Sequence, residues 1–256
     1  YAVLVQALGA VAGAGGAALW ARGSEAAVVV AWWAAFLVLT IVGERLELAR
    51  IAFLARGTEP RILAEAGALL VALTATLVAP AVGYPVLGLV LGILVVDVAT
   101  HDVAWRTVRI PGLPRFVAVC LLTGYAWALV SALVWIIGGP AWSGYRYDLV
   151  VHALTIGFAL SMVIAHAPVI VPAVIRRELP YHPVMWAVWA LLQVGLIVRG
   201  LAGARAAEGA WQFGGAIDVI ALLAFVVSTA TLVVAAARRS ARGTRPAKEQ
   251  MDASAP

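Results

Sequence analysis

Charged residues are scarce in this chain. Asp, Glu, Lys and Arg make up 12% of its 256 residues, whereas an ordinary soluble domain has about 25%. A chain with so few charges cannot cover a globule with polar surface, which excludes a disordered protein and a soluble α/β enzyme. The hydrophobic fraction of 64% and the mean hydropathy of +0.99 indicate a membrane protein instead.

Cysteine is almost absent as well. The single cysteine, Cys120, lies in an apolar run, so the chain can form no internal disulfide and contains no Cys-x-x-Cys metal motif. The GxGxxG, Walker and GxSxG motifs of nucleotide-binding and hydrolytic sites do not occur either. Any chemistry must therefore come from ionisable side chains placed within apolar segments.

Long apolar runs dominate the sequence. They are continuous in Val, Leu, Ile and Ala, without the alternating pattern of a membrane β-barrel, and several approach the roughly 18 residues of a membrane-spanning helix. The sequence thus predicts an all-α, polytopic membrane helix bundle with about eight transmembrane helices. The predicted spans are 2–20, 26–42, 62–82, 86–100, 116–138, 149–175, 183–202 and 213–237.

The basic residues predict the orientation of this bundle. With both termini in the cytoplasm, 14 of the 18 Lys and Arg residues fall on the cytoplasmic side, as expected for a bacterial cytoplasmic (inner) membrane protein. The net charge of +5 therefore reflects basic residues that orient the protein in the membrane and does not indicate a nucleic-acid partner. The expected partner is the lipid bilayer. Residues 1–239 form one predicted transmembrane domain, and the polar residues 240–256 a disordered cytoplasmic tail.

Ionisable residues within apolar segments are candidate functional groups, because they are costly in a membrane. Asp97 precedes His101 by four residues, so it could orient that imidazole on one helix face, or simply cap the helix end. Glu44 lies in a segment with Glu47 and Arg50, which is either a solvated charged face or the place where one carboxylate faces inward.

A second group of ionisable residues falls near the outer ends of the last three spans. Asp148, Arg199 and Asp218 carry opposite charges at similar predicted depths. A structural salt bridge is the favoured interpretation and catalysis the alternative, with Arg199 and Asp218 as supporting residues of a site.

Histidine provides the candidate cofactor ligands. His152 and His166 lie on one predicted helix, 14 residues apart. In an α-helix this spacing leaves them about 40° apart around the axis and about 21 Å apart along it. A membrane cytochrome of the b type uses such a spacing to hang two haems from one helix, because electrons hop between stacked centres. Hydrogen-bonded or pore-lining histidines are the alternative.

The other two histidines do not complete two bis-histidine sites. By the predicted topology, His101 and His182 both lie on the inner side, close to the level of His166, while His152 lies alone near the outer side. We therefore expect one inner site with two or three histidines, suited to haem, copper or zinc. We also expect an outer site at His152, where Asp148 precedes the histidine by four residues.

The sequence around these residues resembles the NnrS-like membrane proteins. The resemblance rests on His152-Ala-Leu-Thr-Ile-Gly-Phe followed by His166-Ala-Pro, and best covers residues 148–200. It implies haem b and copper, a link to nitric oxide metabolism in denitrifying bacteria, and His152 and His166 as ligands. Members of that family are longer, with about twelve spans.

A second likeness concerns copper alone. The run Asp148-x3-His152 followed by His166 is similar to the Asp-His-His copper motif in a membrane subunit of methane and ammonia monooxygenases, although the gap between the histidines differs by one residue. The rest of the chain does not resemble that subunit.

Three functions follow from these observations. The leading expectation is a b-type haem protein, with or without copper, in electron transfer or nitric oxide metabolism, working with a redox partner or other membrane subunits. The second is a copper-binding subunit of a larger oxidase or monooxygenase complex that uses Asp148, His152 and His166. The third is a non-redox transporter or structural membrane subunit.

Overall fold

Every element of the described chain is a helix. The structure, a computed structural model, describes residues 1–48 and 57–243, and within them it confirms the predicted all-α fold. The elements are α1 (Ala2–Ala21), α2 (Ala26–Leu48), α3 (Thr58–Val78), α4 (Pro80–His101), α5 (Ala104–Thr107), α6 (Leu113–Gly138), α7 (Gly144–His152), η1 (Ala153–Leu160), α8 (Ser161–Ile175), α9 (Val184–Ala204) and α10 (Glu208–Gly243).

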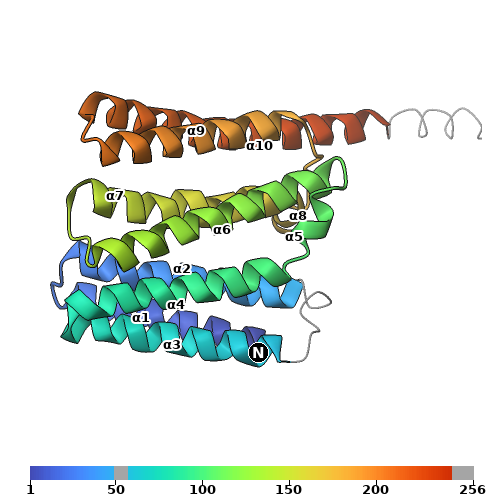
Figure 1. Ribbon diagram of the computed structural model, residues 1–256. Coiled ribbons are helices and arrows are strands. Elements are labelled where there is room, and N and C mark those ends of the chain that lie inside the picture. The colour runs from blue at the N-terminus through green and yellow to red at the C-terminus, as the bar shows by residue number, and fades with distance from the viewer. Residues whose placement is uncertain (49–56, 244–256) are drawn as a thin grey trace, which may run out of the picture.

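Eight of the helical segments are long and apolar enough to cross a membrane, as the sequence predicts. One of them, Gly144–Ile175, consists of α7, η1 and α8 in direct succession. The segments alternate in direction, so Tyr1 and Gly243 lie at the same end of the bundle (Figure 1). We call this end the terminal end and the opposite one the distal end.

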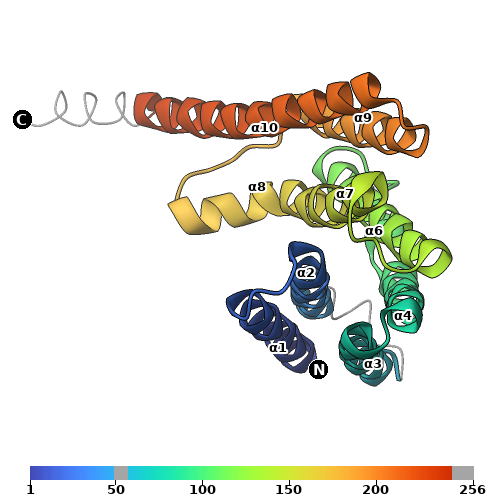
Figure 2. The ribbon, with the colours of Figure 1, turned by 90° about the vertical axis from the view of Figure 1, so that its left-hand side faces the viewer.

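Neighbouring helices pack in pairs and layers (Figures 1 and 2). Helix α1 packs on α2, α3 on α4, and α4 on α6, while α6 also contacts η1 and α8. Helices α9 and α10 pack on each other and form the outermost layer. The apolar core is shared by the helices from α1 to α9 and by Ala221 of α10, with fully buried side chains such as Leu39, Leu94, Phe116 and Phe158.

The boundary between α3 and α4 differs from the predicted one. The sequence places the break at residues 83–85, but the helices part at Ala79, and Pro80 is the first residue of α4. Proline suits that position because its missing N–H would have no partner there. Gly83 then lies in α4 against α3, where a Cβ would be 2.5 Å from the backbone nitrogen of Thr76. The close helix pair, not a turn, requires this glycine.

The helix that carries two of the histidines is not a continuous α-helix. Residues Ala153–Leu160 form a π-helix, whose hydrogen bonds reach five residues back. A π segment accommodates an additional residue, so the 14 residues from His152 to His166 turn about as far as 13 residues of an α-helix. The two side chains then stand about 140° apart instead of about 40°. The expectation of a shared face assumed α geometry and is wrong.

The predicted end of the membrane domain at residue 239 also shifts. Helix α10 continues to Gly243, so the predicted tail begins with helix. Its remainder, 244–256, lies outside the described residues, as does Arg50.

Candidate functional site

The most buried ion pair lies near the terminal end. Arg45 of α2 donates from Nη2 to both carboxylate oxygens of Asp102 at 2.9 Å, and from Nε to Oδ2 at 3.0 Å. The side chains are 6% and 0% exposed, respectively. Two buried charges are stable only when the remaining donors and acceptors are also satisfied.

The surrounding groups provide these partners. The Tyr125 hydroxyl donates to Asp102 Oδ2 at 2.7 Å, and the Ala104 amide donates to Oδ1 at 2.8 Å. Tyr125 lies on α6, and Asp102 follows the last residue of α4. The carboxylate therefore joins α2, α4, α5 and α6 through one fully hydrogen-bonded centre.

His166 extends this centre to α8. Its Nδ1 lies 2.7 Å from the carbonyl oxygen of Met162, and its Nε2 lies 3.2 Å from Arg45 Nη1. Because a carbonyl only accepts and a guanidinium only donates, Nδ1 carries the proton and Nε2 accepts. The imidazole is thus neutral in this arrangement. We call Arg45, Asp102, Tyr125 and His166 the terminal-end network.

A second ionic cluster lies near the distal end. Arg199 of α9 donates to both oxygens of Asp148, at 2.8 and 2.6 Å, and the Trp211 indole donates to Oδ2 at 2.9 Å. The Arg199 guanidinium also stacks over the Trp211 ring, 4.2 Å from its centroid. The salt bridge that the sequence suggests between Asp148 and Arg199 is therefore present, and it joins α7, α9 and α10.

His152 belongs to this distal-end cluster. Its Nδ1 lies 2.8 Å from the carbonyl oxygen of Asp148 and 3.2 Å from the Oδ1 of the same residue. Donation to the carbonyl leaves Nε2 as an acceptor, and no described residue hydrogen-bonds to it. His152 is 28% exposed at its side chain.

Asp218 lies deeper in the same region but does not join the ion pair. It is 3% exposed, and neither of its carboxylate oxygens has a hydrogen-bond partner among the described residues. Its Oδ1 occupies the space that a Cβ on Gly195 would need. Because Gly195 of α9 has no side chain, there is room for the buried carboxyl group of Asp218 on α10.

Polar side chains also meet midway through the bundle. The Trp127 indole donates to Gln193 Oε1 at 2.7 Å, and Gln193 Nε2 donates to Ser161 Oγ at 3.4 Å. Gln193 is 8% exposed and Ser161 is fully buried. These residues connect α6, α9 and the start of α8. Gly157, in the π segment, provides space for the ring of Trp127, which a Cβ would strike.

Asp97 and His101 make the predicted contact on α4. His101 Nδ1 lies 3.2 Å from Asp97 Oδ1 and 2.8 Å from its backbone oxygen. Asp97 also accepts from Arg61 of α3, at 2.7 and 2.5 Å. Glu65 lines the same surface groove as Arg61 and Asp97. This group faces outward between α3, α4 and α6 and is separate from the terminal-end network.

Two predicted site residues lie away from every cluster. His182 is exposed in the connection between α8 and α9, where its Nδ1 accepts from the Val184 amide at 3.1 Å. Glu44 is exposed, and so is Glu47. Of the two interpretations of this segment, the exposed charged face therefore describes Glu44 and Glu47, and the side chain that turns inward is the intervening Arg45.

Sequence reasoning missed Arg45, Asp102, Tyr125 and Gln193. Arg45 follows the buried residues Val38 and Val42 by seven and three positions, which places it on the buried face of α2. That spacing was the available signal, but positive charges near span ends are ordinarily assigned to the membrane surface.

These arrangements restrict where a metal or haem could bind. Both ring nitrogens of His166 already make hydrogen bonds, and Arg45 occupies the one that would ligate iron or copper, so His166 in this arrangement does not fit an axial ligand. In the part of the chain that is described, no three His, Cys, Asp or Glu side chains form a group that could hold a metal ion. His152, in contrast, keeps an Nε2 to which no described residue hydrogen-bonds.

Comparison with known proteins gives a family but no activity. No curated protein and no solved structure matches this chain. The resemblance to the NnrS-like proteins therefore stays an expectation. The model of the family described as "Domain of unknown function (DUF8744)" matches residues 1–234, which end about three quarters of the way along α10. The chain therefore belongs to this family.

Proposed function

We propose that this protein spans the bacterial cytoplasmic membrane eight times, with both termini in the cytoplasm, and conducts protons across it without redox chemistry. The observation that carries this proposal is a row of polar side chains that runs along the inside of the bundle. It begins at the distal-end cluster, continues through Gln193 and Ser161, and ends at the terminal-end network. Ionisable groups inside a membrane protein typically mark ion pathways and proton relays.

The length of this row of polar side chains supports a path across the whole bilayer. Asp148 and His166 are 18 residues apart on one helical segment, and because the π segment absorbs about one of them, this corresponds to about 26 Å along the axis. The hydrocarbon core of a bilayer is about 30 Å thick. The steps between the groups are shorter: Ser161 and His166 lie about 7 Å apart along the helix, and Gln193 and Arg199 about 9 Å. The proposed path needs chains of at least two ordered waters to bridge such gaps.

We propose that two groups on or beside this path exchange protons. Asp218 is a buried carboxyl group without a hydrogen-bond partner among the described residues, and an ionised carboxylate at such a site is costly. His166 accepts from Arg45 through Nε2, so taking up a proton there breaks this bond and releases Arg45 from the imidazole. We assign proton exchange to Asp218 on the distal side and to His166 on the terminal side.

Reconstituted vesicles test the proposal. Purified protein in liposomes with a trapped pH dye and a potassium diffusion potential is expected to acidify or alkalinise the interior with the sign of the potential. Asp218→Asn should lower this flux about tenfold or more, since the amide cannot exchange a proton. Glu44→Gln, which neutralises an exposed carboxylate, should leave the flux unchanged. Size-exclusion profiles identify variants that fail to fold.

Two results would contradict this function. The wild type could show no flux above that of empty liposomes, or Asp218→Asn could conduct as well as the wild type.

The redox function expected from the sequence is a second proposal, and His152 is the residue that favours it. Its Nδ1 donates to a backbone carbonyl, which is the bond that orients ligating imidazoles in metal sites. A haem b or copper bound at Nε2 would need a further ligand from a partner subunit or another molecule. A reduced-minus-oxidised spectrum without an α-band near about 560 nm excludes haem b, and metal analysis of the same sample decides on copper.

A further inference from the structure

A long apolar groove runs between α8 and α10 towards the terminal end. Its volume is about 650 Å³. Apolar side chains of α8, such as Ala167 and Ile170, and of α10, such as Phe225 and Val226, line it together with Thr229. Thr229 is the one polar residue among them, so the groove suits a hydrocarbon chain and offers almost nothing to a polar ligand.

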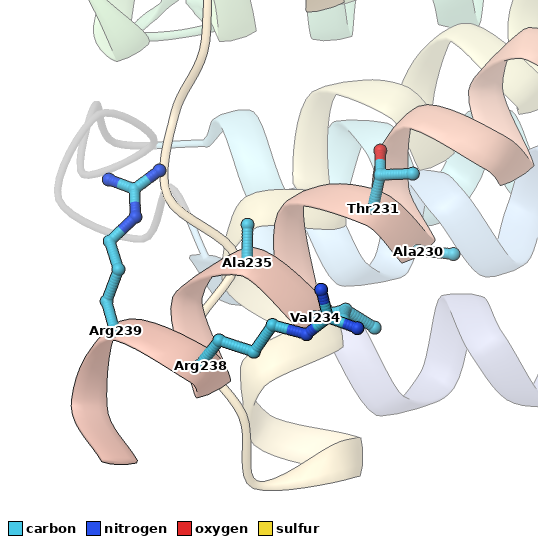
Figure 3. Close-up of a pocket in the computed structure, with 6 residues that line it drawn as sticks. All are labelled: Ala230, Thr231, Val234, Ala235, Arg238 and Arg239. Atoms are coloured by element: carbon cyan, nitrogen blue, oxygen red, sulfur yellow. The ribbon is translucent and has the colours of Figure 1, made fainter. Parts of the chain in front are cut away.

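The groove continues into a basic mouth at the end of α10. A second hollow of about 590 Å³ shares Ala230 and Val234 with the groove and adds Arg238 and Arg239 (Figure 3). The Arg238 side chain folds back along α10 towards Val234 (Figure 3). On the opposite wall, the lining residue Ile175 ends α8 and is followed by two further arginines, at 176 and 177. Positive charge therefore flanks one end of the apolar groove.

Helix α10 is poorly covered by the rest of the protein. Its packing is mainly against α9, and 11% of its most apolar window is buried. Side chains that point away from α9, such as Leu223 and Val226, are more than 60% exposed. An amphiphile with an apolar tail and a negative head matches both parts of this surface, whereas a soluble anion would match the mouth alone.

We propose that the groove between α8 and α10 binds one anionic diacyl phospholipid, with its acyl chains in the groove and its phosphate against Arg238 and Arg239. Arginine suits this role because its planar guanidinium donates two parallel hydrogen bonds to phosphate oxygens. Anionic lipids are attracted to basic clusters at the cytoplasmic membrane surface. The bound lipid fills the groove and so adds contacts between α8 and the inner half of α10.

Native mass spectrometry of the full chain tests this site. Detergent-purified protein is titrated with dioleoyl phosphatidylglycerol or with phosphatidylcholine of the same chains. We expect one retained phosphatidylglycerol at concentrations where phosphatidylcholine is lost. The double variant R238Q/R239Q should weaken phosphatidylglycerol binding about tenfold or more. The matched control R22Q/R205Q removes the same charge from exposed arginines at the distal end and should bind like the wild type.

A second variant separates the groove from the charges. Ala230 lines both hollows and is exposed, so Ala230→Phe fills the groove without disturbing the core. This variant should weaken phosphatidylglycerol binding although all arginines remain. In the wild type, glycerol phosphate, which lacks acyl chains, should not displace the bound lipid. Equal retention of both lipids, equal effects of the two double variants, or a lipid-free dimer that Ala230→Phe dissociates would each overturn the proposal. None of these readouts depends on proton flux.

Discussion

Arg45 shows how a charged side chain is retained inside this bundle. Its guanidinium is 6% exposed, yet it donates to both oxygens of Asp102 and to His166 Nε2. Asp102 in turn accepts from Tyr125 and from the Ala104 amide. Desolvating the two charges is costly, and only this complete set of partners offsets the cost. Removing one partner should therefore lower the free energy of unfolding by far more than the loss of one hydrogen bond would.

Asp102→Asn tests this dependence. The substitution keeps the shape of the side chain but leaves Arg45 as a buried, unpaired cation, so we expect a loss of about 3–5 kcal/mol in the free energy of unfolding. Tyr125→Phe removes one donor to Asp102 and should cost less, about 1–3 kcal/mol. Thermal or denaturant unfolding in detergent, followed by tryptophan fluorescence, measures both.

Glu44→Gln is the control for these two variants. It lies next to Arg45 in the chain but is exposed, and its effect should stay within about 0.5 kcal/mol. If Asp102→Asn were as harmless as this control, Arg45 would have to be solvated in the native state.

The contacts of the ionisable residues show which part of the site the sequence could predict and which it could not. The contact between Asp97 and His101, four residues apart, follows from helix geometry and is predictable. The bonds of Arg45 to Asp102 and His166 connect residues 57 and 121 positions apart. Such contacts depend on which helices become neighbours, and periodicity within one span carries no information about that.

Helices α9 and α10 approach each other closely because glycines line their contact. A Cβ on Gly214 would lie 2.7 Å from the backbone nitrogen of Arg199 and 2.9 Å from the carbonyl oxygen of Gly195. Small residues allow such close helix packing in membranes, where van der Waals contact between helices is a main source of stability. The pair also carries Arg199, Trp211 and Asp218, so its spacing sets the distal-end cluster.

Gly214→Ala should separate these helices. The added methyl group meets rigid backbone atoms, and we expect a loss of about 1–3 kcal/mol from overpacking. Gly209→Ala on the same helix is the matched control, because a Cβ there meets no atom within 4 Å. It should be neutral or slightly stabilising, since alanine favours a helix over glycine. Equal unfolding temperatures for the two variants would show that α9 and α10 are not in close contact.

The helices themselves were largely predictable, and their internal irregularity was not. Continuous apolar runs define all eight spans, because length and hydropathy suffice to recognise a segment that can cross a membrane. The π-helix at Ala153–Leu160 left no comparable signal. It rotates His166 away from the helix face of His152 and towards Arg45, so the shared face inferred from α-helical spacing is lost, whereas their predicted separation into two sites does not depend on it.

The arrangement of the eight spans gives the proposed proton path a direction. The distal-end cluster and the terminal-end network lie at opposite ends of the bundle, and the basic residues cluster at the terminal end. On the basis of the positive-inside rule we propose that the terminal end faces the cytoplasm. On this orientation, Asp148 and His152 face the extracytoplasmic side, and the lipid groove opens to the inner leaflet.

Cysteine labelling in intact cells measures this orientation. Ser143, before α7, and Glu178, between α8 and α9, are both exposed in connections at opposite ends of the bundle. Ser143→Cys should react with a membrane-impermeant maleimide added outside, whereas Glu178→Cys should react only after the cells are permeabilised. The wild type serves as its own background, because Cys120 is fully buried in α6 and should stay unlabelled. The opposite pattern would place the terminal end outside, and with it the arginines of the lipid groove and the His166 side of the proton path.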